Sequence, residues 1–265
     1  MKIERLVLVM KDVIKNGIKF AAIMLPFAAI GGFFAGRYSF ATMSADMQQM
    51  LLAEIGSVNV YATISMVQSV MYAIVCGILG YLLAEKIGLL KTFGFQKKKL
   101  AKTAVIAALC GVVFSLDYWT FGAWIPQVAE SYQSEIIIRS VDNWIASVFY
   151  GGIIEELMLR FFLMSLLVFI IWKLFFKKRE KVAIPVMVFV IANGIAALVF
   201  AAGHLPATIL AFGELSFLIV LRCFVLNGLF GFVFGEIYRK YGIQYAIVGH
   251  MGTHIVSKLI WLVLL

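Results

Sequence analysis

Residues 182–203 read VAIPVMVFVIANGIAALVFAAG, a run without a charged side chain. A transmembrane helix needs about 20 consecutive, predominantly apolar residues, so this run is predicted to cross a bilayer. The preceding apolar run, 144–172, reads WIASVFYGGIIEELMLRFFLMSLLVFIIW. It carries only three charged residues, Glu155, Glu156 and Arg160, and is also predicted to cross the bilayer.

The composition of the whole chain agrees with a membrane protein. Of its 265 residues, 63% are hydrophobic and 14% are charged, and the mean hydropathy is +0.99. A soluble domain has about 45–50% apolar and about 25% charged residues, so soluble and disordered classes are excluded. The apolar runs are long and continuous, which excludes a barrel of short alternating strands. Cys76, Cys110 and Cys223 lie inside these runs and are expected to be buried thiols, because their spacing fits neither a disulfide framework nor a zinc motif.

We therefore predict an all-α, polytopic transmembrane bundle of about seven helices. The fourth predicted span is long for a single crossing, so we expect it to tilt or to protrude. No internal repeat is recognised. The predicted spans are 17–36, 60–83, 103–123, 144–172, 182–203, 215–235 and 243–264.

The charges between the predicted spans alternate in sign. They sum to +3 for 1–19, −1 for 37–54, +5 for 85–102, −3 for 117–142, +4 for 173–181, −1 for 204–214 and +1 for 236–240. Because basic loops stay in the cytoplasm, the N-terminus is predicted to be cytoplasmic and the C-terminus to be outside. This bias accounts for the net charge of +9 without a nucleic-acid partner. Residues 1–19 are interpreted as an interfacial segment, not a cleaved signal.

The charged residues of the fourth span are the first candidates for a functional site, because ionisable groups inside a bilayer are costly. Glu156 and Arg160 are four residues apart and can pair on one helix face. Glu155 points about 100° away from Glu156 and has no obvious local partner. A charged clamp between helices and a functional site explain this cluster about equally well.

The chain has three histidines, and all lie near or inside predicted spans. His204 ends the fifth span, and His250 and His254 share one face of the last span. A hairpin turning near 178–181 brings His204 to the height of Glu155. His250 fits less well, because it lies only about ten residues from the inner loop and falls some 10 Å too deep on a straight helix.

The sixth span carries further polar and small residues. Arg222 is expected to make a structural pair, with Glu214 or with the spare carboxylate of the fourth span, and Asn227 follows it. Gly228, Gly231 and Gly235 have the small-residue spacing typical of close helix packing and are not needed for catalysis.

Four motifs follow one another along the second half of the chain. They are Glu155-Glu156-x-x-x-Arg160, Phe200-x-x-x-His204, Phe230-x-x-x-Phe234 and His250-x-x-x-His254. In this order they resemble the CPBP family of membrane proteases, which includes the type II CAAX prenyl endopeptidases and bacteriocin-processing and immunity-type (ABI-like) proteins. The resemblance covers about residues 144–265, interpreted as a four-span catalytic core, and residues 1–143 form a three-span region without a recognised motif.

The resemblance implies an intramembrane endopeptidase in which Glu155, assisted by His204, activates water. It implies that Arg160 pairs with Glu156, and that His250 and residue 254 hold the oxyanion. The last family position is usually Asn or Asp, whereas this chain has His254, which can donate, accept or bind a metal. The implied substrate is a peptide bond near the membrane in a hydrophobic or lipidated partner.

Several alternatives stay open at this stage. Glu155, His204, His250 and His254 are a plausible zinc set, although water activation without a cofactor is favoured. A small-solute transporter also places such groups in the membrane. A family member without proteolytic activity would act by binding a partner. We expect an integral, multi-pass protein surrounded by membrane lipid, in a prokaryotic plasma membrane, and leave its oligomeric state open.

Overall fold

The computed structural model describes residues 2–176 and 184–265, and every element in this part is helical. Six segments are long and apolar enough to cross a membrane, which confirms the polytopic helical class. They are Met10–Ala41, Val58–Ile87, Val141–Phe175, Val186–Phe212, Phe217–Tyr241 and Ile243–Leu264. The predicted turn at 178–181, the last residues of the basic loop 173–181 and the first two residues of the predicted span 182–203 lie outside the described residues.

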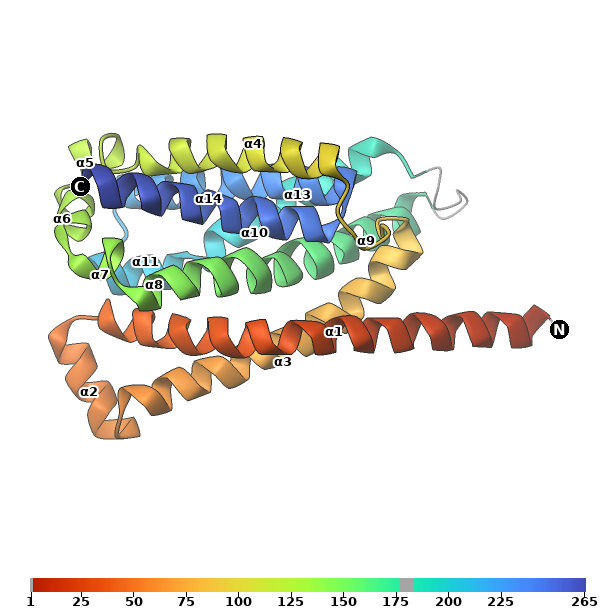
Figure 1. The fold of residues 1–265 in the computed structure, drawn as a ribbon, viewed down its shortest axis with the longest axis horizontal. Helices are drawn as coiled ribbons and strands as arrows, with labels where there is room; N and C mark the ends of the chain where they lie inside the picture. The colour runs from red at the N-terminus through yellow and green to blue at the C-terminus, as the bar shows by residue number, and fades with distance from the viewer. Residues whose placement is uncertain (1, 177–183) are drawn as a thin grey trace.

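The helices lie side by side along the long axis of the molecule (Figure 1). Helix α1 (Lys2–Ala41) and α3 (Val58–Ile87), joined by α2 (Ala45–Ile55), form a hairpin on one side. The N-terminal part of α1 extends beyond the other helices (Figure 1). Small residues let the hairpin close, since a Cβ on Gly36 would lie 2.7 Å from the Cα of Ala62.

Helix α4 (Lys97–Ser115) is the segment predicted as the third span, and it lies along α14 (Ile243–Leu264) (Figure 1). The expected helix over 103–123 is wrong in its bounds. It begins earlier, inside the lysine-rich segment, and ends at Ser115. Four short helices follow it: α5 (Phe121–Trp124), α6 (Pro126–Gln133), α7 (Glu135–Ile138) and α8 (Val141–Ile145).

A buried ion pair lies two residues beyond the end of α4. Arg222 donates to both carboxylate oxygens of Asp117, at 2.9 and 3.0 Å from Nε, and Tyr132 donates to Oδ2 at 2.7 Å. Burial and the Asp117 carboxylate raise the pKa of the Tyr132 phenol well above its usual value, so this hydroxyl stays protonated. Arg222 thus has a structural partner, as expected, but the expected partners Glu214 and Glu155 are wrong.

The fourth span is one continuous helix, from α8 through the π-helical η1 (Ala146–Met164) to α9 (Ser165–Phe175). The fifth consists of α10 (Val186–Gly203) and α11 (Leu205–Phe212). The sixth consists of α12 (Phe217–Cys223), the π-helical η3 (Phe224–Gly228) and α13 (Leu229–Tyr241). The core lies around η1, where Ile154, Leu157 and Phe161 have no exposed surface. Cys76, Cys110 and Cys223 are free and buried, as expected.

Candidate active site

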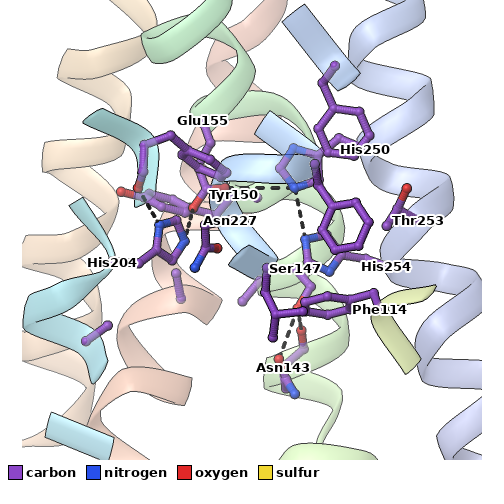
Figure 2. Close-up of a pocket in the computed structure, with 18 of the residues that line it drawn as sticks. Phe114, Asn143, Ser147, Tyr150, Glu155, His204, Asn227, His250, Thr253 and His254 are labelled. Carbon is purple, nitrogen blue, oxygen red and sulfur yellow. Dashed lines mark hydrogen bonds and ion pairs between the residues drawn. The ribbon is translucent and has the colours of Figure 1, made fainter. Parts of the chain in front are cut away.

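Four of the six predicted site residues line one cavity of about 280 Å³ (Figure 2). Its walls come from helices far apart in the sequence, because α1, α4, η1, α10, α11, η3, α13 and α14 each contribute side chains. Most of the lining is apolar, with a few polar groups that converge, which is the composition typical of a ligand site. Glu155, His204, His250 and His254 line the cavity, whereas Glu156 and Arg160 lie buried behind it.

Glu155 and His204 face each other across the cavity. The Nε2 atom of His204 is 3.6 Å from Oε1 of Glu155, and both side chains remain partly exposed. The Nδ1 atom of His204 is 2.9 Å from the backbone oxygen of Phe200. A carbonyl oxygen can only accept, so Nδ1 carries the proton and the lone pair of a neutral His204 points from Nε2 toward Glu155.

The chain breaks its helix at His204, which ends α10 and precedes α11. Pro206 lies in the first turn of α11, a position where its missing N–H costs nothing. The Thr208 hydroxyl donates to the His204 backbone oxygen at 2.8 Å. The break therefore exposes the imidazole to the cavity while the backbone stays hydrogen-bonded.

Glu156 and Arg160 form a buried ion pair with an Oε1–Nη1 distance of 3.1 Å, as the sequence predicted. Neither side chain has more than 1% of its surface exposed. The guanidinium lies over the Phe200 ring, 4.4 Å from its centroid, a cation–π contact. A Cβ on Gly231 would lie 2.8 Å from Nη2 of Arg160, so this glycine makes room for the guanidinium.

His250 connects the ion pair to the cavity. Its Nδ1 atom is 2.9 Å from Oε1 of Glu156, its Nε2 atom is 4.0 Å from Oε2 of Glu155, and its ring stacks on Phe234. The Nε2 atoms of His250 and His254 are 3.1 Å apart. Since the carboxylate of Glu156 accepts from Nδ1, this short distance requires a proton between the two Nε2 atoms.

The structure therefore brings all six predicted residues together, including His250. Glu155 and His204 lie at the same height, as expected for a hairpin that turns near 178–181. The difference in depth that the sequence suggested for His250 is absent, because α9 extends past the start of α14 (Figure 1). His250, about two turns into α14, thus lies level with the middle of η1.

Two glycines in η1 let α14 approach the carboxylates. A Cβ on Gly152 would lie 2.3 Å from Cγ of Met251, and one on Gly151 would lie 3.1 Å from Nε2 of His254. Both positions fall inside the π-helical stretch, a rare conformation that is enriched at functional sites. The local backbone of η1 therefore sets the distance between the acids and the histidines.

The cavity also contains polar residues that the sequence analysis did not assign to the site. Tyr150, Asn143 and Ser147 line it from η1 and α8. Asn227, noted only as a polar residue of its span, lines it from η3 and donates from Nδ2 to the Cys223 backbone oxygen at 2.8 Å. The signal available for these residues was a polar side chain within an apolar run, which alone does not identify a cavity.

The expected packing role of the glycines in the sixth span holds for two of them. Gly231 lies against Arg160, and a Cβ on Gly235 would overlap the Asn193 side chain at 1.8 Å from Oδ1. Gly228 has more room, since a Cβ there would have its nearest neighbour at 3.9 Å, the Cβ of Ala201. Of the three, only Gly231 touches a predicted site residue.

The zinc alternative concerns Glu155, His204, His250 and His254. Within residues 2–176 and 184–265, no group of three or more His, Cys, Asp or Glu side chains is arranged to hold a metal ion. One of the four candidate zinc ligands is already engaged, because Nε2 of His250 is hydrogen-bonded to Nε2 of His254.

Comparison with known families agrees with the motifs. Residues 138–256 match the family model described as Type II CAAX prenyl endopeptidase Rce1-like. The match supports a CPBP family intramembrane protease, and it includes all six predicted site residues. No curated protein and no solved structure matches the chain.

Proposed function

We propose that this protein is an intramembrane endopeptidase in which Glu155 and His204 activate a water molecule. The observation that carries the proposal is the 3.6 Å approach of Glu155 Oε1 to His204 Nε2 inside a cavity of about 280 Å³. Two acceptor atoms this close, with no donor between them, are suited to hold one water by both of its protons. The Rce1-like match supports proteolysis as the reaction.

The proposed reaction is the hydrolysis of a peptide bond. Glu155, assisted by His204, takes a proton from water as the oxygen attacks the substrate carbonyl carbon. The C–N bond of the tetrahedral intermediate then breaks, and the same proton goes to the leaving amine.

His250 and His254 are proposed to bind the oxyanion. Both residues line the cavity, and Nε2 of His250 is 4.0 Å from Glu155 Oε2. Glu156 keeps a proton on Nδ1 of His250, and Arg160 balances the charge of Glu156. Donors held in place before the reaction contribute more than donors that must reorient. Glu156 and Arg160 are therefore positioning residues.

The proposed substrate is a hydrophobic or lipidated peptide. The lining of the cavity is mostly apolar, with Phe114, Phe200, Phe230 and Phe234 among its side chains. Such walls favour apolar residues around the scissile bond and give little support to a small polar solute. The family description names prenylated substrates, and prenylated peptides are thus one class to test.

The experiment is peptide cleavage by the purified protein in liposomes, with hydrophobic and prenylated fluorogenic peptides. Wild type is expected to cleave, and Glu155→Gln and His204→Ala are each expected to lose about 10²–10⁴-fold in rate. Glu214→Gln, at an exposed acid on the outer side, serves as the matched control and is expected to keep full activity. A zinc chelator is expected to have no effect.

Two results would contradict the proposal. Cleavage that persists in Glu155→Gln would remove the glutamate from the reaction, and loss of cleavage with chelator would favour the zinc set. If no peptide is cleaved by folded wild type, the partner-binding and transport alternatives become the better explanations.

A further inference from the structure

The two ends of the bundle differ strongly in charge. One end carries the start of α4, with Lys97, Lys98 and Lys99, and the end of α13, with Arg239 and Lys240. We call it the basic end. The opposite end carries α2 and α5–α8, with acidic residues such as Asp46, Glu54, Glu130 and Glu135. By the positive-inside rule, the basic end faces the cytoplasm. The opposite end then faces away from the cytoplasm, and we call it the outer end.

The cavity reaches the outer end of several helices. Tyr38 lies in the last turn of α1, which ends at Ala41, and Phe114 is the residue before the last in α4. Asn143 lies in α8, before the long π-helical stretch begins, and Ala207 lies beyond the end of α10. These four lining residues belong to four separate segments, and each is close to the outer end of its span.

Toward the basic end the cavity is closed. Its lining residues nearest that end are Phe234 and His250, which lie about two helical turns from the inner ends of α13 and α14. Behind them lies the Glu156–Arg160 ion pair, with at most 1% of either side chain exposed. Tyr238 follows, fully buried and 2.8 Å from the hydroxyl of Ser165. Packed side chains thus separate the site from the cytoplasmic face.

We propose that the cavity admits water and substrate from the outer face of the membrane, opposite the basic end. This inference rests on the proposed function, because a peptide that enters the cavity is a substrate only of a protease. The substrate class is then a membrane-associated peptide whose scissile bond lies in the outer half of the bilayer. A peptide confined to the cytoplasmic leaflet does not reach Glu155.

The test is cysteine labelling with a membrane-impermeant maleimide in intact cells that express the full chain. Ser147→Cys and Ala35→Cys place thiols on the cavity wall by small changes. Glu54→Cys marks the outer end, and Lys98→Cys marks the basic end, both at exposed positions. Wild type is the labelling blank, because its three cysteines are buried. Melting temperatures in detergent show that each variant is folded.

We expect Ser147→Cys and Ala35→Cys to be labelled in intact cells, as Glu54→Cys is, and Lys98→Cys to be labelled only after permeabilisation. Labelling of the cavity cysteines only after permeabilisation, or not at all, would overturn the proposal. Labelling of Lys98→Cys instead of Glu54→Cys in intact cells would overturn it as well. Labelling is measured without any cleavage. It therefore tests the side from which the cavity is reached even if the protein has no protease activity.

Discussion

Glu155 and Glu156 are neighbours in the chain, but their carboxylates belong to different environments. Glu156 is fully buried and contacts Arg160 at 3.1 Å and His250 at 2.9 Å. Glu155 opens into the cavity and has His204 at 3.6 Å. One acid therefore holds the site together, while the other is free to act on a bound molecule.

This difference predicts unequal effects on stability for two otherwise identical substitutions. Glu156→Gln leaves Arg160 as an uncompensated buried charge, and we expect it to lower the free energy of unfolding by about 3–5 kcal/mol. Glu155→Gln removes no ion pair of this kind and is expected to change stability by less than about 1 kcal/mol. Thermal unfolding in detergent, measured beside activity, separates the two. Equal destabilisation by both variants would contradict the assignment.

The close packing at Gly231 leads to a second prediction, which compares two glycine-to-alanine variants. Gly231→Ala places a Cβ 2.8 Å from Nη2 of Arg160 and 3.1 Å from the Phe200 ring, so either the guanidinium or the ring must move. Overpacking of this kind costs about 1–3 kcal/mol, and we also expect a lower kcat because Arg160 holds Glu156. Gly228→Ala, with its nearest neighbour at 3.9 Å, is the control and should keep activity. An active, stable Gly231→Ala variant would show that the close contact is unimportant.

His254 occupies a position that is usually Asn or Asp in the family that the sequence resembles. His254→Asn retains a hydrogen-bond donor near His250, so we expect cleavage to be kept or raised. His254→Leu removes the donor at similar volume, and we expect kcat to fall by about 10²–10³-fold. The measurement is kcat and KM for one peptide with all three proteins. A rise in KM alone for His254→Leu would assign the residue to substrate binding instead.

The Asp117–Arg222 pair predicts a loss of stability without a direct effect on the chemistry. Asp117→Asn leaves Arg222 without its carboxylate, and we expect the free energy of unfolding to fall by up to about 3–5 kcal/mol. Glu135→Gln removes the exposed partner of Arg139 and should cost no more than about 1 kcal/mol. At temperatures where Asp117→Asn is folded, its kcat should equal that of wild type. A folded but inactive variant would place this pair in the catalytic cycle.

The membrane class and most helices could be predicted from the sequence because hydrophobic length is a local property. The predicted span 243–264 has the same bounds as the observed helix, Ile243–Leu264. The third span was less accurate, since α4 ends at Ser115 and the residues that follow it include Asp117, whose partner Arg222 lies far along the chain. A distant ion pair leaves no trace in local hydropathy.

The sequence by itself determined which residues are candidates for the site, since Glu155, Glu156, Arg160 and the three histidines are ionisable groups in apolar runs, in an order that resembles a family. Only the tertiary structure decided the surroundings of each side chain. Which glutamate faces Arg160 and which faces His204 depends on the π-helical backbone of η1 and on the close approach of α14 at Gly151 and Gly152. The cavity likewise arises from the packing of separate helices, whose relative depth no single span encodes.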